Sequence, residues 1–330
     1  MSIQELARNP AELVNRIVYA NPCKSTRDIE YAVEMGSPVT VVDSVEEVEK
    51  LQAYSGGALI RLAVDDSGSK MPFSTKFGTS VETCVAIGQA AAATGLDIHG
   101  ISFHVGSGCT MGRSYAEAIR MAHKCLGLLG RGNTIDIGGG YLPDSFDFQE
   151  KAVAIRAAID EVQQNSNVNF IAEPGRFFAG RGFDFFVQVI GKKAGLRGWS
   201  YTIDDSIYGQ FSSILFDHAD PVWIRIQEDD YKRPQGPGVI FGRTCDSVDV
   251  IACSPSMEEL CVGDWLWFPN MGAYTRATAS EFNGFPRPRV FADDEAAAVI
   301  THSFQALLPK GVQYMPSVSA RDFWQREKLM

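Results

Sequence analysis

Three glycine-containing segments hold the side chains of this sequence that could bind a phosphorylated cofactor. The first is His104 followed by Gly106-Ser107-Gly108, between an apolar run and a helical pattern. Backbone amides at a helix N-terminus and a Ser hydroxyl can bind phosphate together, and a ring just before them could lie against a flat cofactor. The alternative is a core histidine satisfied by the fold. Ser114 and Glu117 form a capping box that predicts the start of the following helix.

The second and third segments are Asp136-Ile137-Gly138-Gly139-Gly140 and Glu173-Pro174-Gly175-Arg176. Three consecutive glycines exceed what a tight turn needs and let the backbone approach a ligand closely. A carboxylate at Glu173 could keep a pyridine nitrogen protonated, which strengthens an electron sink. Arg176 could bind phosphate as a planar, permanently charged group. The alternatives are an ordinary strand-to-helix turn and a surface ion pair.

Two acidic segments, Asp204-Asp205 and Thr244-Cys245-Asp246, could bind the amine of a cationic substrate. Cys245 could also exchange a proton near a reacting carbon, although nothing around it in the sequence indicates a shifted pKa. The alternative is turn chemistry on a solvated face. Lys24 follows a strand end, as a lysine bound covalently to a cofactor could, but most lysines are solvated surface groups.

Repeated β-α units must position the first three segments. Helical patterns separate the apolar runs, and continuous apolar strands of this kind indicate a parallel sheet with functional groups at the strand ends. The sequence predicts strands at Ile17–Ala20, Val39–Val42, Ala58–Ala63, Ile98–Val105, Thr134–Ile137 and Val168–Ala172. These are about six βα units, whereas a closed barrel needs eight. A helix is also predicted at Ile3–Ala7, before the first strand.

The remainder of the chain is predicted to be mostly β, a sandwich or small barrel. Its strands are predicted at Phe183–Val189, Trp199–Ile203, Val222–Ile226, Gly238–Phe241, Val248–Ile251 and Trp265–Phe268, separated by turn residues. The fold class is therefore α/β plus all-β: an incomplete (β/α)8 barrel followed by a C-terminal β domain. We place the boundary between residues 1–178 and 179–330.

Composition narrows the classes of function. The formal charge of −10 over 330 residues argues against a nucleic-acid or anionic-membrane surface and suits a cationic small substrate. Seven Cys without a CxxC pair are typical of reduced thiols, so we expect a cytoplasmic protein. No apolar run is long enough to span a membrane.

Together the motifs resemble one family, the eukaryotic-type ornithine decarboxylases, which are pyridoxal-phosphate enzymes with an alanine-racemase-like fold. Ten motifs carry the resemblance in the family's order, which is far more specific than any single one. They are Tyr19–Lys24, Ser102–Cys109, Asp136–Gly140, Ala172–Phe177, Asp205–Phe211, Phe216–Ala219, Thr244–Asp249, Val262–Trp265, Asn270–Thr275 and Phe282–Phe285.

The resemblance implies a homodimer with shared active sites, the cofactor pyridoxal 5'-phosphate and the substrate L-ornithine. His104 would stack on the cofactor ring and Glu173 would pair with its nitrogen. The phosphate would be bound by Ser107, Gly139, Gly140, Arg176 and Tyr274. Around the substrate, Asp205 would bind the distal amine, Phe282 would wall the pocket, and Asp246 and Cys245 would come from the second subunit, with Cys245 as the proton donor.

The sequence departs from the family pattern at three places. The family's Schiff-base lysine lies in a motif like Tyr-Ala-Val-Lys, which this sequence lacks, and Lys24 aligns with a different family lysine. The segment Met1–Leu6 resembles the helix after the family's second barrel strand, so we expect a truncated form whose isolated chain has weak activity and poor solubility. Arg243 stands where the family usually has Pro.

Two functional hypotheses follow from the resemblance. The first is decarboxylation of L-ornithine to putrescine, in polyamine biosynthesis. The second is a catalytically inactive homologue that acts as a partner or regulator of an active decarboxylase or of its regulators. Arginine and lysine decarboxylases share the cofactor motifs, and the sequence does not measure the depth of the substrate pocket.

Overall fold

The computed structural model describes residues 16–52, 54–143, 145–195, 198–226 and 232–291. The chain divides into two compact units, Met1–Gly175 and Arg176–Met330. The helix predicted at Ile3–Ala7 lies outside the described residues.

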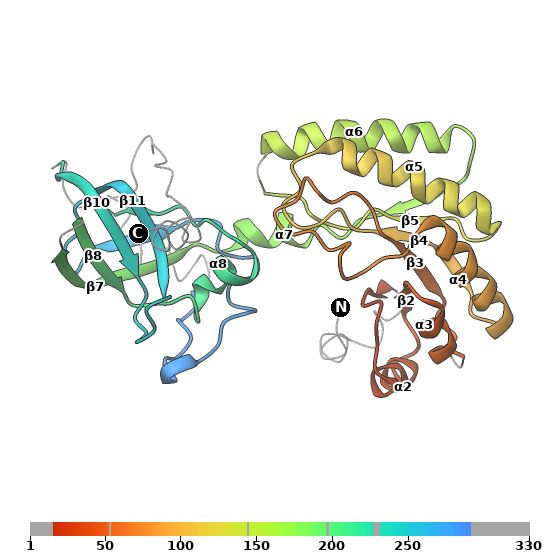
Figure 1. Ribbon diagram of the computed structural model, residues 1–330, viewed down its shortest axis with the longest axis horizontal. Helices are drawn as coiled ribbons and strands as arrows, with labels where there is room; N and C mark the ends of the chain where they lie inside the picture. Colours follow the sequence, from red (N-terminus) through yellow and green to blue (C-terminus); the bar gives the residue numbers. More distant parts are fainter. Residues whose placement is uncertain (1–15, 53, 144, 196–197, 227–231, 292–330) are drawn as a thin grey trace. The chain divides into compact units, whose positions relative to one another are not determined.

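The first unit is built on a parallel sheet whose strands follow one another in chain order (Figure 1). Apolar runs flanked by helices form parallel strands because both faces of such a sheet are covered. The strands are β1 (Val18–Tyr19), β2 (Val39–Val42), β3 (Ala58–Leu62), β4 (Ile98–Phe103), β5 (Thr134–Asp136) and β6 (Asn169–Ile171). This order confirms the predicted barrel-type architecture of six βα units.

Five helices connect these strands, and α4 and α5 lie along the same side of the sheet (Figure 1). Ser25, Ser44 and Ser80 cap the first three of the helices with their side-chain oxygens. The helices are α2 (Thr26–Glu34), α3 (Val45–Lys50), α4 (Val81–Thr94), α5 (Gly112–Leu129) and α6 (Ser145–Gln163).

The capping box predicted for α5 is wrong. The helix begins at Gly112, Met111 precedes it without a side-chain cap, and Ser114 is buried inside the first turn. A Cβ on Gly112 would lie 3.0 Å from the Ala154 Cβ of α6. The start of α5 is therefore set by close packing of two helices, which a local capping rule does not include.

Lys24 belongs to a buried ion pair rather than to an active site. Its ammonium is fully buried and lies 2.9 Å from Glu47 Oε1. It also donates to the Asn21 and Val41 carbonyl oxygens at 3.0 and 2.8 Å. Burial lowers the pKa of Lys24, while Glu47 raises it. These contacts tie the loop after β1 to β2, and all of them are structural.

Lys24→Met is expected to destabilise the protein by about 3–5 kcal/mol, because it leaves the buried Glu47 carboxylate without its main partner. Urea unfolding measures this loss. Lys50→Met is the matched control, since the Lys50 side chain also pairs with Glu47 but is 37% exposed; about 1 kcal/mol is expected. Equal losses for the two variants would contradict the prediction.

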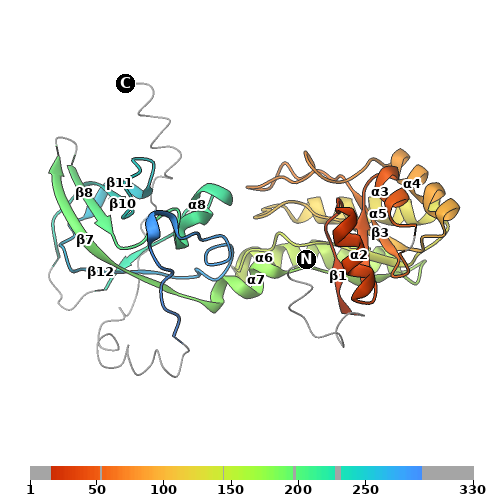
Figure 2. The same ribbon diagram turned by 90° about the horizontal axis from the view of Figure 1, so that it is seen from below.

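The second unit is built on a mixed sheet with strand order β11-β10-β8-β7-β12-β9. Its strands are β7 (Phe185–Gly195), β8 (Gly198–Ile203), β9 (Ile224–Arg225), β10 (Gln235–Phe241), β11 (Val250–Glu258) and β12 (Trp265–Phe268). Among the described strands of this sheet, only β8 and β10 pair in parallel. The prediction of a mostly β second half is confirmed, and β7 is visibly curved in Figure 2.

Short helices and a buried aromatic core complete this unit. Phe211 and Phe268 pack edge to face at 4.7 Å in the core, beside Tyr201. The short helical segments are α7 (Gly175–Ala179), η2 (Gly180–Gly182), η3 (Gln210–Ser212), α8 (Ser213–Phe216) and η4 (Phe282–Gly284). Among the described residues, no helix has both the length and the apolar character needed to cross a membrane.

Candidate functional site

A row of polar side chains lies on one face of the parallel sheet, at the C-terminal ends of its strands. Arg61 pairs in register with Ser102, and Ser102 pairs with Asp136. Paired residues of parallel strands point to the same face, so the three share one side of the sheet. Their neighbours on the other face, Ile60 and Ile101, are fully buried. At these strand ends the parallel sheet therefore has a polar face on one side and a buried apolar face on the other.

His104 continues this face just beyond β4. Its Nδ1 accepts a hydrogen bond from Gly106 N at 3.0 Å, which leaves Nε2 to carry the proton. Burial and the nearby Arg61 cation lower the pKa of His104 to about 4. The Phe73 ring lies 4.9 Å from the imidazole. His104 therefore presents a neutral, fixed aromatic ring at neutral pH.

The two glycine loops that follow β4 and β5 touch through their backbones. A Cβ on Gly140 would lie 2.3 Å from the Gly106 carbonyl oxygen, and φ of Gly140 is +97°. A Cβ on Gly138 would lie 2.3 Å from the Phe103 carbonyl oxygen. The Tyr115 hydroxyl donates to the Gly139 carbonyl oxygen at 2.8 Å. Only glycine permits this approach of one loop to the other.

The glycine loop after β5 presents backbone N–H donors rather than side chains. Gly139 is buried, yet among the described residues neither its N–H nor that of Gly140 has a protein acceptor. Buried N–H groups are rarely left unpaired. Neighbouring unpaired N–H groups in a small-residue loop are typical of an anion-binding site. The arrangement therefore fits a phosphate group.

Glu173 lies beside this cradle. Its N–H donates to the Gly138 carbonyl oxygen at 2.8 Å. Burial, and then the Glu173 charge, raise the pKa of Asp136 to about 7. Burial lowers the pKa of Arg61, while Glu173 and Asp136 raise it. Arg61 is thus surrounded by carboxyls, of which Asp136 and Glu173 also interact with each other.

Asp136→Asn is expected to change the pH dependence of stability. The native state keeps a proton on Asp136 up to about pH 7, whereas the unfolded chain releases it near pH 4. The free energy of unfolding of the wild type therefore falls as the pH rises from about 4 to about 7. The free energy of unfolding of the variant, relative to that of the wild type, should therefore increase from pH 4 to pH 7 by at most about 4 kcal/mol. Above pH 7 the difference should stay constant.

Urea unfolding at a series of pH values measures that difference. The contribution of His104 is common to both proteins and cancels. Asp160→Asn, an exposed carboxylate of α6, should give a difference that does not change with pH. A constant difference for Asp136→Asn as well would contradict the prediction, because it would show that folding does not raise the pKa of this carboxyl.

In the second unit, Arg176 and Tyr274 lie together. The Arg176 guanidinium is 4.6 Å from the centre of the Tyr274 ring and forms an ion pair with Asp217. Tyr274 has a positive φ of 55° and is half exposed. Two of the predicted phosphate ligands are thus neighbours, although Asp217 neutralises one of them.

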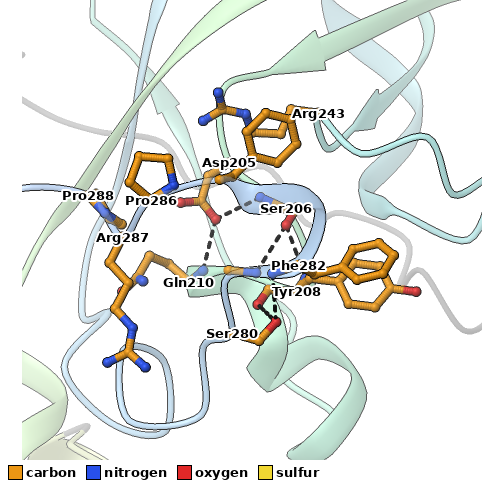
Figure 3. A pocket seen from close by; sticks show the side chains of 12 residues that line it. Asp205, Ser206, Tyr208, Gln210, Arg243, Ser280, Phe282, Pro286, Arg287 and Pro288 are labelled. Carbon is orange, nitrogen blue, oxygen red and sulfur yellow. Dashed lines mark hydrogen bonds between the residues drawn. The ribbon is translucent and has the colours of Figure 1, made fainter.

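Asp205 lines a small pocket in the same unit (Figure 3). Its Oδ1 accepts hydrogen bonds from Ser206 N at 2.7 Å and Gln210 N at 2.8 Å. Its Oδ2 has no donor within the described part of the chain. Burial raises the pKa of Asp205 to about 6, while the two N–H groups and Arg243 oppose that rise. A buried carboxylate with one open oxygen can bind a cation.

The predicted residues Asp246, Cys245 and Phe282 form a second cluster at the edge of this pocket. The Tyr208 hydroxyl donates to Asp246, and its ring stacks on Phe282 at 4.2 Å. This hydrogen bond lowers the pKa of Asp246. The exposed Cys245 Sγ donates to Asn283 Oδ1 at 3.7 Å.

The structure brings predicted segments together within each unit, and it adds neighbours that the sequence analysis did not name. Arg61 was missed, although a single charge in the apolar strand Ala58–Leu62 is a detectable signal. Tyr208 and Phe73 gave no signal, because their partners Asp246 and His104 are distant in sequence. Ser107 was predicted correctly to lie in the first loop, where its backbone pairs with Met71 in both directions.

A parallel βα sheet with an anion cradle, a neutral histidine ring and a carboxylate at its strand ends, joined to a sheet domain, defines a class of enzymes that bind a phosphorylated cofactor. Residues 2–180 match the family description "Pyridoxal-dependent decarboxylase, pyridoxal binding domain". Residues 181–272 match "Pyridoxal-dependent decarboxylase, C-terminal sheet domain". The chain belongs to this family of pyridoxal-dependent decarboxylases.

Curated relatives include ornithine decarboxylases and an antizyme inhibitor. Ornithine decarboxylase of Caenorhabditis elegans is 36% identical over 83% of this chain and 70% of its own length. The probable ornithine decarboxylase of Dictyostelium discoideum is also 36% identical, over 84% of this chain and 64% of its own length. Antizyme inhibitor 2 of Xenopus laevis is 36% identical over 87% of this chain and 68% of its own length. The chain spans about two thirds of these relatives.

Solved structures show the same fold. The arginine decarboxylase of Paramecium bursaria Chlorella virus, bound to agmatine, has a TM-score of 0.81 at 31% identity, over 86% of this chain and 80% of that one. The lysine/ornithine decarboxylase of Vibrio vulnificus, complexed with cadaverine, has a TM-score of 0.78 at 33% identity, over 89% of this chain and 80% of that one. Both neighbours confirm the predicted fold class.

Proposed function

We propose that the protein decarboxylates L-ornithine to putrescine with pyridoxal 5'-phosphate, within a homodimer that shares its active sites. The observation that supports this substrate is the state of Asp205. It is a buried carboxylate that lines the pocket, and its Oδ1 accepts hydrogen bonds from two N–H groups while its Oδ2 is open. Such an oxygen accepts the hydrogen bonds of an ammonium group. The negative net charge of the chain also agrees with a cationic substrate.

In the first unit, each group has a distinct task. Pyridoxal phosphate supplies the electron sink that takes up the negative charge when the carboxylate leaves as carbon dioxide. The Gly139 and Gly140 amides bind phosphate oxygens, together with Ser107. Glu173 holds a proton on the pyridine nitrogen. The neutral His104 ring would lie against the bound cofactor and exclude water from it.

The second unit supplies the remaining groups. Arg176 and Tyr274 bind phosphate, which requires Arg176 to share its charge between Asp217 and the ligand. Asp205 binds the distal ammonium, with Phe282 as an apolar wall. Asp246 and Cys245, which lie at the edge of the Asp205 pocket in their own chain, would serve the active site of the other subunit across the dimer. Cys245 delivers a proton to the α-carbon after decarboxylation.

The test is release of carbon dioxide from L-ornithine labelled at C1, with putrescine measured by chromatography. The full-length protein with pyridoxal phosphate should release both in equal amounts, and Asp205→Asn should raise KM more than it lowers kcat. Asp160→Asn serves as a charge-matched control. Turnover of L-lysine or L-arginine ahead of L-ornithine would contradict the substrate assignment.

A second candidate is a catalytically inactive relative that binds a decarboxylase or its regulators. One observation favours it, the similarity to Antizyme inhibitor 2 of Xenopus laevis. Binding of pyridoxal phosphate without any turnover of the three amino acids would support this candidate against the first.

A further inference from the structure

Arg243 connects the two acidic loops of the second unit. Its N–H donates to the Asp205 carbonyl oxygen at 3.0 Å. Its Nη1 donates to the Asp204 carbonyl oxygen at 2.7 Å. Its guanidinium lies on the Phe285 ring, 3.8 Å from the ring centre. A proline at this position, as in the resembling family, would lack both donors.

Asp249 joins the same loops from inside the domain. Its Oδ1 accepts from Ile207 N at 2.9 Å, and its Oδ2 accepts from Thr244 N at 3.1 Å. Asp249 is fully buried. The loops are therefore already fixed to each other without the Arg243 side chain. A purely structural role does not account for a guanidinium at the pocket.

The hydrogen bonding of Arg243 is also incomplete. Its Nε is buried, and the described residues provide it with no acceptor. A buried unsatisfied donor costs about 1–3 kcal/mol. Arg243 lines the pocket together with Asp205 (Figure 3). The Arg243 cation therefore lines the same pocket as the Asp205 carboxylate, and its unsatisfied Nε lowers the stability of the fold.

We propose that Arg243 is a positioning residue for the ligand pocket: anchored on the Asp204 carbonyl oxygen and the Phe285 ring, its guanidinium places a permanent cation beside Asp205 that favours the carboxylate able to bind an ammonium ligand. This inference rests on the proposed function of Asp205. Among the described residues, the charged groups that line the pocket with that carboxyl or act on it are Asp204, Arg243 and Arg287. Arg243 is the cation that lowers the pKa of Asp205, against burial and Asp204.

The test is the pH dependence of binding of 1,4-diaminobutane to the full-length protein, by titration calorimetry. Binding by the wild type should weaken as the pH falls through about 6, because Asp205 takes up a proton. Arg243→Met and Arg243→Pro should move this acid limb of the binding profile to higher pH, because they remove a cation that opposes protonation of Asp205. Above pH 8 they should bind at least as tightly as the wild type, because the cation also repels the ammonium.

Four controls separate this role from a merely structural one. Arg243→Lys keeps the charge and should restore the limb of the wild type. Asp205→Asn should abolish the limb, which identifies the group that titrates. Lys192→Met removes one exposed positive charge from the same unit and should leave the limb unchanged. Circular dichroism verifies that each variant is folded.

The outcomes are distinct. An unmoved limb in Arg243→Met, affinity lowered equally at every pH, or no binding by the wild type would overturn the inference. Binding of the diamine requires no turnover, so a moved limb in a protein without decarboxylase activity would refute only the proposed function. An unmoved limb in an active decarboxylase would refute only the role of Arg243.

Discussion

Glu173→Gln is expected to lower kcat for L-ornithine by about 10²- to 10³-fold, the loss typical of removing one electrostatic contact to a developing charge. Glutamine keeps the size of the side chain but loses the negative charge that holds a proton on the pyridine nitrogen. Affinity for pyridoxal phosphate should change much less, because the Gly139 and Gly140 amides are untouched. Steady-state kinetics and a cofactor titration separate the two effects.

A second readout of this variant needs no turnover. The Glu173 charge raises the pKa of Asp136, so its removal should narrow the pH window in which the native state loses stability. Glu117→Gln, an exposed change on α5, is the matched control and should alter neither property. Normal kcat in Glu173→Gln would contradict the role assigned to this carboxylate.

Gly140→Ala is expected to reduce affinity for pyridoxal phosphate by about a hundredfold or more and to destabilise the protein by about 2–4 kcal/mol. The added Cβ would lie 2.3 Å from the Gly106 carbonyl oxygen, and φ of +97° is unfavourable for alanine. The two loops must separate, so the cradle opens. Fluorescence titration with the cofactor and urea unfolding measure the two losses.

Gly127→Ala is the matched control. Gly127 lies inside α5, and a Cβ added there would meet no atom of a neighbouring element within 4 Å. Alanine is the better helix former, so this variant should be more stable by up to about 1 kcal/mol. Equal cofactor affinity in the wild type and Gly140→Ala would show that the loops do not form the phosphate site.

The first unit was predictable because its signals are local. Each apolar run, such as Val39–Val42, is a strand in the structure within a few residues of its predicted ends. The order of the strands follows from the alternation with helices, because parallel strands need crossovers of one hand. The position of the Gly138–Gly140 loop at a strand end follows from the same alternation.

The side-chain partners in the second unit were less predictable. The ring contact of Tyr208 with Phe282 joins residues far apart in the chain, and so does its hydrogen bond to Asp246. Arg243 was visible in the sequence only as a departure from a family pattern. Its contacts with Asp204 and Phe285 depend on how the two loops fold over the sheet.

The sequence by itself determined the βα alternation, the β second half and the position of the glycine loops at strand ends, because periodicity and glycine placement are properties of neighbouring residues. Tertiary structure alone decided where α5 begins, since Gly112 packs on α6. It also decided the charge state of the site. The pKa values of His104 and Asp136 are moved by burial and by charges from other strands, and neither burial nor strand register is written in a local pattern.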